Sequence, residues 1–437
     1  MLNSLANWQP YTRMLSLLGK SLCNSCCCGG VDDSSDSAEE ERRRFPPSKS
    51  TSKSANKNES DMSSSQARFV PNPFADYDGQ ESLTSPSDSG ALREDLAKPI
   101  TEAAFADSSS SLLGVWERNF AKDLDGGRDQ SVYTGIAGSA LLYLKLAEGA
   151  RAKQGSPVAA AECLHYLQKA ASLVDLTLGG QPARKRGYGV PTFLCGEVGL
   201  QTVAALLEAK LRRGLPGNGA EDLLNRIAAH APSVLDLDHK MGRSGHERDL
   251  PDELLYGRAG YLYALLLLRR ELARDDPYIG SKCAQILPDQ LIRSVVQAIL
   301  DSGLRTSAQR PDIPSPLVYF WHGSPYVGAA HGYAGIAYLL LQARAYLTEQ
   351  QLRELVKPMI DFVCSLRFPG TDNFPSSMGE DKTDKLVHWC HGSPGVVYML
   401  ATASEVFGAE GEGRQYAEIA LKAGEDIWTR GLLKKGK

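Results

Sequence analysis

The chain has 437 residues, a formal net charge of −4 and a hydrophobic fraction of 42%. That much apolar material is enough for a sizeable buried core, and the slightly acidic balance lacks the basic surface that nucleic-acid binding requires. No run reaches the roughly 18 uninterrupted apolar residues of a membrane span. Nine cysteines, scattered without paired spacing, are typical of reduced thiols in a cytoplasmic protein.

The first 67 residues are predicted to form a disordered extension. Residues 31–67 are rich in Ser, Asp, Glu and Lys, so they cannot bury enough apolar surface to offset the entropy of ordering. Residues 1–30 contain no acidic residue and end in a cluster of four cysteines. The four are Cys23, Cys26, Cys27 and Cys28. Two interpretations stay open: S-acylation that attaches the protein peripherally to the plasma membrane, or an unstructured leader or transit peptide.

The predicted folded domain, residues 68–437, contains five Gly-x-x-Gly steps, each followed by a long apolar run. The first glycines of the steps are Gly135, Gly196, Gly257, Gly332 and Gly392. They follow one another at intervals of 61, 61, 75 and 60 residues, and a period near sixty suits a helical hairpin. Glycines three apart share one face of a helix's first turn, where missing side chains let backbones approach closely.

The segments after and between the steps differ in their hydrophobic pattern. The runs after the steps, such as residues 139–146, are apolar on nearly every face, which favours inner helices buried on most sides. Intervening stretches, such as residues 221–230, have the amphipathic spacing of outer helices. The sequence therefore predicts an all-α fold, an α/α toroid (barrel) of helical hairpins with five glycine-rich helix starts around a common centre.

Chemically reactive side chains stand directly before the fourth and fifth steps. His331 precedes the fourth, and Cys390 with His391 precedes the fifth. Both groups are therefore expected at the mouths of inner helices, where the helix N-terminus favours a thiolate over a thiol. Two interpretations of Cys390 stay open at this point. It is either a nucleophile or soft-metal ligand, or a buried structural cysteine, which is the commoner fate of a free thiol.

Four strings of the sequence resemble the eukaryotic LanC-like (lanthionine synthetase C-like) proteins. They are DKLVHWCHGSPGVVYML at 384–400, YVGAAHGYAG at 326–335, ELLYGR at 253–258 and FVPNPFADY at 69–77. The resemblance runs from about residue 68 to the last residue, and long identical strings make it specific. Residues 1–67 match nothing in this family.

The resemblance implies an α/α barrel with a central zinc ion held by two cysteines and one histidine. Bacterial members add a peptide cysteine to dehydroalanine or dehydrobutyrine, and eukaryotic members resemble them but add glutathione to dehydroamino acids in damaged phosphoproteins. Carried over, Cys390 matches a zinc ligand and His331 the catalytic histidine that protonates the enolate. Glu253 stands where bacterial enzymes have a catalytic aspartate, with Asp252 competing for that role. Lys435 matches a lysine that contacts glutathione, so zinc and glutathione are the expected cofactor and co-substrate.

The sequence also departs from the family pattern. It has five of the family's seven glycine steps, and it ends at Lys437 before the second zinc-binding cysteine and its adjacent histidine. A later arginine–aspartate pair that meets glutathione is missing as well. With Cys390, and at most His391 beside it, the chain offers fewer than the three or four ligands that zinc sites use. We therefore expect a C-terminally truncated, incomplete toroid whose zinc site is incomplete.

Three functions remain for testing. The first is a zinc-dependent glutathione transferase that modifies dehydroamino-acid residues in proteins. The second is a non-catalytic adaptor at the membrane that binds glutathione or a partner. The third is a glycosidase-like toroid, which would need two facing carboxylates. The sequence disfavours this third function, because Glu197 and the Asp252–Glu253 pair are the only acids at the predicted helix mouths.

Overall fold

The computed structural model of the chain describes residues 129–152, 157–178, 190–211, 219–238, 240–241, 248–379 and 383–432. Several predictions concern residues outside this description: the extension 1–67, the boundary at residue 68 and the glutathione contact of Lys435. The four N-terminal cysteines, Cys23, Cys26, Cys27 and Cys28, also lie outside it. Among the described residues, no helix is both long enough and apolar enough to cross a membrane.

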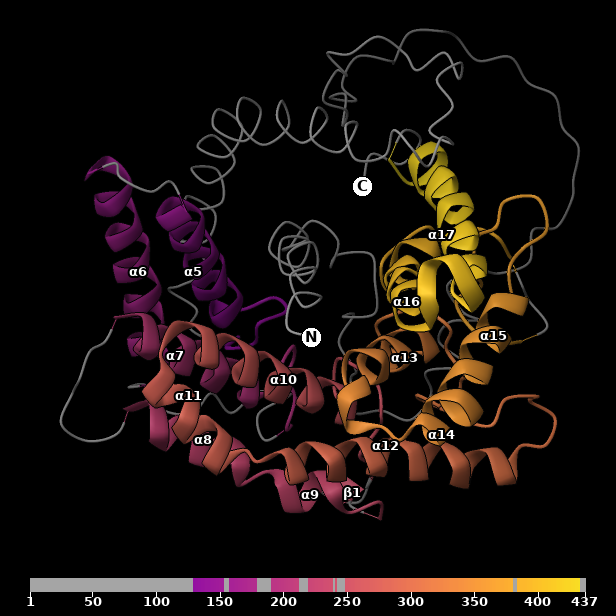
Figure 1. The fold of residues 1–437 in the computed structure, drawn as a ribbon, viewed down its shortest axis with the longest axis horizontal. Coiled ribbons are helices and arrows are strands. Elements are labelled where there is room, and N and C mark those ends of the chain that lie inside the picture. The colour runs from indigo at the N-terminus through magenta and orange to yellow at the C-terminus, as the bar shows by residue number, and fades with distance from the viewer. Residues whose placement is uncertain are drawn as a thin grey trace, which may run out of the picture. The chain divides into compact units, whose positions relative to one another are not determined.

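The regular secondary structure of the described residues is almost entirely helical, as Figure 1 shows. The helices that follow the glycine steps are α5 (Ile136–Ala152), α7 (Glu197–Leu211), α10 (Arg258–Asp275), α13 (Tyr333–Gln342) and α16 (Ser393–Phe407). The remaining α-helices are α6 (Pro157–Leu178), α8 (Gly219–Ala228), α9 (Ala231–Leu235), α11 (Pro277–Ile286), α12 (Asp289–Gln309), α14 (Glu349–Gln351), α15 (Lys357–Ser365) and α17 (Arg414–Asp426). Short 3-10 or π turns are η2 (Arg344–Tyr346), η3 (Leu352–Val356), η4 (Gly408–Glu412) and η5 (Ile427–Leu432).

The helices that follow the steps form an inner row. Each begins directly after the first glycine of its step, and each packs against the next in the order α5, α7, α10, α13, α16. Burial on nearly all faces accompanies their apolar sequences: every residue of α13 except the last, Gln342, is buried. This row forms the core from which the loops before the steps extend.

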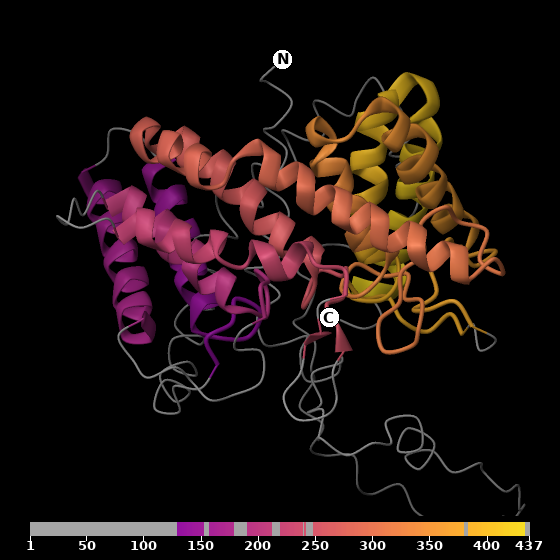
Figure 2. The same cartoon turned by 90° about the horizontal axis from the view of Figure 1, so that it is seen from below.

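An outer helix packs against each inner helix: α6 on α5, α8 on α7, α11 and α12 on α10, α15 on α13, and α17 on α16. The pairs α5 with α6 and α16 with α17 lie side by side in both views (Figures 1 and 2). The third repeat is longer than the others because it holds two outer helices, α11 and α12. The prediction of an all-α fold built from helical hairpins is confirmed.

One small antiparallel ribbon departs from the helical pattern. Strand β1 (Lys240–Met241) pairs with β2 (Arg248–Asp249), with Lys240 opposite Asp249. The ribbon lies in the connection between α9 and α10, directly before the loop that leads into the third glycine step. It adds two residues of strand on each side and leaves the two-layer helical arrangement unchanged.

Each glycine step is needed because the preceding loop folds back onto it. A Cβ placed on Gly138, Gly199 or Gly335 would lie 1.9–2.1 Å from the carbonyl oxygen of the residue six positions earlier. The same loops accept hydrogen bonds from the first helical N–H groups, such as Arg258 N to Pro251 O at 2.9 Å. These bonds satisfy N–H groups that a helix N-terminus leaves unpaired. The close backbone approach predicted from the glycine spacing is therefore made by the chain's own preceding loop.

Candidate functional site

A histidine–carboxylate pair is buried where two of these loops meet. His331, directly before α13, places its Nδ1 2.7 Å from Oε2 of Glu253, which lies in the loop before α10. His331 is 7% exposed and Glu253 is 2% exposed. A backbone hydrogen bond from Leu254 N to Ala330 O, at 3.3 Å, joins the two loops beside the pair. Residues 78 positions apart in sequence thus form one acid–base unit.

The Glu253 carboxylate is held by its own loop. It accepts hydrogen bonds from the backbone N–H of Leu255, at 3.0 Å, and from the backbone N–H of Tyr256. An ionised carboxylate only accepts hydrogen bonds, so this contact requires a proton on Nδ1 of His331 whenever Glu253 is ionised. That arrangement orients the imidazole so that proton exchange with a reactant goes through Nε2, as in other carboxylate-oriented histidines.

The neighbouring acid, Asp252, has different partners. Its Oδ1 accepts from Arg258 at 3.0 Å and its Oδ2 accepts from the hydroxyl of Ser302 at 2.6 Å. Burial raises the pKa of Asp252, although the Arg258 guanidinium and the Ser302 hydroxyl both oppose that shift. Of the two carboxylates that competed for the catalytic position, Glu253 contacts His331 and Asp252 contacts Arg258.

Arg258 is a buried structural centre that sequence reasoning missed. It is 2% exposed, and besides Asp252 its guanidinium donates to the carbonyl oxygens of Val234, Leu250 and Asp236 at 2.6–2.9 Å. These bonds tie the end of α9 and the loop before α10 to the first residue of α10. An arginine placed inside an apolar helix start was the signal that could have revealed this role.

Three aromatic side chains surround the imidazole of His331. The Trp321 and Tyr256 rings lie 5.7 and 6.2 Å from its centroid with planes within 16° and 3° of parallel. The same two rings lie 5.6 Å from each other at 17°. Tyr326 approaches His331 at 5.9 Å with a tilted ring. The sequence analysis missed Trp321 and Tyr326 as site residues. It also missed Tyr256, although Tyr256 precedes the first glycine of its step just as His331 does.

A tight turn holds Trp321 in this position. Trp321 and Ser324 exchange both backbone hydrogen bonds, each at 3.0 Å, and the turn between them has positive φ at His322 (48°) and Gly323 (74°). Positive φ is costly for a non-glycine residue such as His322. The His322 ring packs edge-on against Trp321 at 4.2 Å.

Cys390 and His391 lie near the same cluster. They are 7% and 5% exposed, and the Tyr326 ring lies 5.6 Å from His391 as well as 5.9 Å from His331. A Cβ on Gly328 would lie only 2.0 Å from the carbonyl oxygen of Cys390, so the fourth and fifth loops touch through their backbones. The structure thus brings Glu253, His331, His391 and Cys390 into one region.

Asn373 attaches the Cys390 loop to helix α16. Its side-chain oxygen accepts from Ser393 N at 2.8 Å, and its amide nitrogen donates to Asp384 Oδ1 at 2.7 Å and to Leu386 O at 2.9 Å. Arg430 binds both carboxylate oxygens of Asp384, at 2.8 and 2.9 Å. Burial alone would raise the pKa of Asp384, but hydrogen bonds from Arg430 and Asn373 bring it below its ordinary value.

The described residues do not complete a zinc site at Cys390. They offer one thiol and the adjacent imidazole of His391 there, fewer than the three protein ligands of catalytic zinc sites. Within the described ranges, three carboxylates of a kind that can bind a metal lie close together at a different place. They are Glu148, Glu271 and Asp275, each with one oxygen within 4.8 Å of the others. Lysine and arginine side chains already neutralise that acidic cluster.

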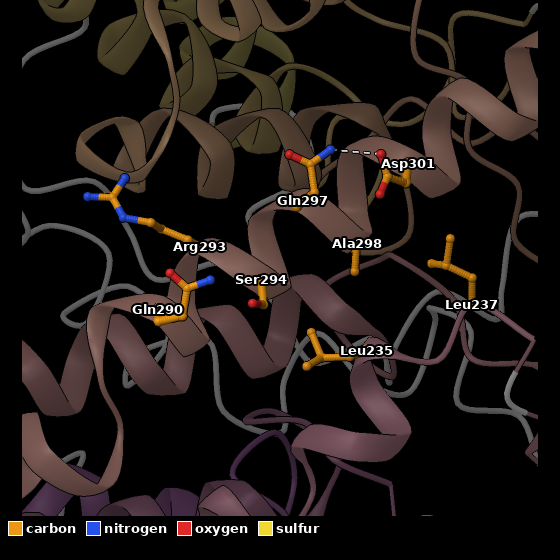
Figure 3. Close-up of a pocket in the computed structure, with 8 residues that line it drawn as sticks. All are labelled: Leu235, Leu237, Gln290, Arg293, Ser294, Gln297, Ala298 and Asp301. Carbon is orange, nitrogen blue, oxygen red and sulfur yellow. Dashed lines mark hydrogen bonds between the residues drawn. The ribbon is translucent and has the colours of Figure 1, made fainter.

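A surface hollow of about 420 Å³ lies between α9 and α12 (Figure 3). Its lining residues are Leu235, Leu237, Gln290, Arg293, Ser294, Gln297, Ala298 and Asp301. Gln297 donates to Asp301 at 2.7 Å along its wall. The hollow shares no lining residue with the cluster around His331.

The family model described as lanthionine synthetase C-like protein matches residues 127–437. A Danio rerio protein named glutathione S-transferase LANCL1 is 39% identical over 375 residues, covering 85% of this chain and 80% of that protein. The Arabidopsis thaliana LanC-like protein GCL1 is 34% identical over 321 residues, covering 70% of this chain and 62% of its own length.

Among solved structures, nisin cyclase is similar with a TM-score of 0.44 and 17% identity, covering 75% of this chain and 76% of that chain. The family match covers all the described helices and the loops that carry Glu253, His331 and Cys390. The chain belongs to the lanthionine synthetase C-like family and shares its all-α, α/α-toroid fold class.

Proposed function

We propose that the protein is a glutathione transferase that adds the thiol of glutathione to dehydroalanine and dehydrobutyrine residues of proteins. The observation that carries the proposal is the buried contact between His331 and Glu253, which supplies an oriented proton donor and acceptor. The name of the Danio rerio relative, glutathione S-transferase, supports the same activity class.

The reaction needs one proton to move and no oxidant or reductant. The thiol sulfur bonds to the β-carbon of the dehydroamino acid, the carbon–carbon double bond opens, and its electron pair moves into an enolate. His331 then delivers a proton from Nε2 to the α-carbon, and the proton lost by the thiol balances the one delivered. Glu253, at Nδ1, stabilises the imidazolium before that transfer and returns the ring to the same orientation afterwards.

The family resemblance adds two expectations to this proposal. Zinc would be bound with Cys390 as one ligand, and Lys435 would contact a carboxylate of glutathione. The donors present around Cys390 in the described ranges are too few for tight zinc binding. Elemental analysis of the purified chain is therefore expected to find well under one zinc per molecule. One tightly held zinc, lost on Cys390→Ala, would contradict this expectation.

Location is a separate part of the proposal. We propose a cytoplasmic protein whose N-terminal cysteines, Cys23, Cys26, Cys27 and Cys28, are acylated and attach it peripherally to the plasma membrane. Two or more acyl chains suffice for stable attachment. Removing residues 1–30 should move the membrane-bound fraction into the soluble fraction, and an unchanged distribution would contradict the acylation.

A direct assay tests the transferase. The protein is incubated with glutathione and a peptide containing one dehydroalanine, and mass spectrometry measures the adduct above the uncatalysed rate. A matched peptide with alanine at that position should gain no mass. Failure of the protein to accelerate adduct formation, with glutathione binding intact in calorimetry, would favour the alternative function. That alternative is a non-catalytic adaptor for glutathione or a partner, and the small set of metal donors near Cys390 is the observation in its favour.

A further inference from the structure

We propose that Trp321 and Tyr256 form the binding surface for the electrophilic reactant, a flat, uncharged, conjugated group such as a dehydroamino-acid residue. This inference rests on the proposed function and extends it, because it names the residues that select one of the two substrates. Glutathione, the other substrate, would approach from a different direction.

The first support is the parallel arrangement of the rings. The Trp321, Tyr256 and His331 planes lie within 17° of one another, with centroids 5.6–6.2 Å apart. Offset parallel faces favour another flat group over a tetrahedral one. In a dehydroamino-acid residue the double bond is conjugated with the carbonyl group, so its atoms lie in one plane. After thiol addition the α- and β-carbons are tetrahedral, which weakens the same contact and favours release of the product.

The second support is the access that these rings have. His331 and Glu253 are buried, whereas Trp321 and Tyr256 are half-buried and His322 and Gly323, at the tip of the turn, are exposed. Trp321 and Tyr256 therefore each expose part of their surface to solvent while their rings contact the imidazole of His331. A group resting on their surface would place its reactive carbons next to the imidazole.

The third support is the backbone that holds Trp321. His322 has a φ of 48°, and within the described residues Asp372 is the only other non-glycine residue with positive φ. Strained conformations of this kind persist where the surrounding structure fixes them, and they gather at binding and catalytic sites. The turn places a large aromatic side chain against His331 at this conformational cost.

The fourth support is charge. The Glu253 carboxylate lies 2.7 Å from His331, and the nearby guanidinium of Arg258 is already bound to Asp252 and to backbone carbonyls. Glutathione carries two carboxylates, which the negative faces of the aromatic rings would repel. The uncharged acceptor fits this environment better than glutathione does.

The test separates the Michaelis constants of the two substrates. In Trp321→Ala, the KM for a dehydroalanine peptide should rise about tenfold, the loss expected for one aromatic contact plus its buried area. The KM for glutathione should stay within about twofold. Trp321→Phe should recover most of the acceptor affinity. Trp428→Ala, which removes a tryptophan that is 47% exposed on η5, is the matched control and should change neither constant.

Either of two outcomes would overturn the inference. They are a rise in the KM for glutathione instead, or unchanged constants in an active Trp321→Ala enzyme. If Trp321→Ala does not fold, as judged by circular dichroism, Tyr256→Leu provides the same comparison from the other ring.

A binding measurement keeps this inference separate from the transferase proposal. Without glutathione, the wild-type protein should bind the dehydroalanine peptide more tightly than its alanine counterpart, and Trp321→Ala should lose that preference. A binding preference without turnover would contradict only the proposed transferase activity. Turnover without the binding preference would contradict only the proposed role of Trp321 and Tyr256 as the binding surface.

Discussion

The two ends of the inner helices perform different tasks. At their N-terminal ends, loops bring together an acid–base pair, aromatic rings and a thiol. At the C-terminal ends of α5, α7 and α10, Lys210 instead bridges Glu148, at 2.8 Å, and Asp275, while Glu271 binds Arg270 and Arg274 at 2.5 Å. Lys210 is 6% exposed and Glu271 is 3% exposed, so both ends bury ionisable groups.

The difference lies in how the charges are balanced. At the C-terminal ends, lysine and arginine side chains pair with each carboxylate and also suit the negative ends of the helix dipoles. At the N-terminal ends, Glu253 faces a histidine, whose charge changes when it exchanges a proton. A fully paired ion network stabilises the fold, whereas a carboxylate–imidazole pair can move protons. In the same row of helices, the C-terminal ends therefore hold the groups that stabilise the fold, and the N-terminal ends hold the groups that can exchange protons.

The largest expected effect comes from breaking the acid–base pair. His331→Ala should lower kcat for adduct formation by about 10²–10⁴-fold, the usual contribution of a positioned general acid or base. The matched control is His230→Ala, because His230 also pairs with a carboxylate, Glu197, at 3.2 Å, but has no contact with the aromatic cluster. Steady-state kinetics on both variants decide the role. Equal losses of activity would show that His331 acts through stability rather than chemistry.

The ion network should give the reverse result. Lys210→Met leaves Glu148 and Asp275 without their shared cation and is expected to lower the free energy of unfolding by about 3 kcal/mol. At urea concentrations below the unfolding transition, the kcat of Lys210→Met should equal that of the wild type. Lys145→Met removes a more exposed partner of Glu148 and should cost less than about 1 kcal/mol. Urea denaturation measures both, and a large loss of kcat in folded Lys210→Met would contradict the separation of the two ends.

One helix allows the same substitution at both ends. In α5, a Cβ on Gly138 would lie 2.1 Å from Val132 O, whereas a Cβ on Gly149 would meet no atom within 4 Å. Gly138→Ala should therefore destabilise by about 1–3 kcal/mol through overpacking. Gly149→Ala should stabilise by about 0.5–1 kcal/mol, because alanine favours a helix interior. Thermal melts of the two variants compare them directly, and equal shifts would show that the folded-back loop does not require glycine.

The smallest effect is a pH dependence of stability. Burial alone would raise the pKa of Glu148 and of Asp275. Lys145 and Lys210 nevertheless bring the pKa of Glu148 below its ordinary value of 4.5, and Arg274 and Lys210 bring that of Asp275 below 3.8. A carboxyl whose folded pKa is lowered stabilises the fold above its unfolded pKa, and this stabilisation is lost as pH falls through the folded value. Stability should thus decrease below about pH 4.5. Lys210→Met should flatten that decrease in urea titrations at several pH values, and an unchanged slope would assign the acid sensitivity to other carboxylates.

Sequence and structure agree best where the reason is local. The glycine spacing and the apolar runs predicted where the inner helices begin. They could do so because close backbone approach at a helix start requires glycine, and glycine is visible in the sequence. The sequence could not decide between Asp252 and Glu253, since adjacent carboxylates look alike until the turn that binds Leu255 and Tyr256 N–H is formed. The packing of Trp321 against His331 depends on how the loop between α12 and α13 folds. No spacing rule predicts that contact.

The folded-back loops have a consequence for how this architecture diversifies. Each loop meets its helix through backbone carbonyls, so the side chain just before the first glycine can change without rebuilding the cap. The five equivalent positions hold Thr134, Cys195, Tyr256, His331 and His391. One scaffold thus presents a hydroxyl, a thiol, a phenol and two imidazoles at equivalent positions of its five steps. A protein engineer could vary these five codons together and sample new reactivities while every helix start stays intact.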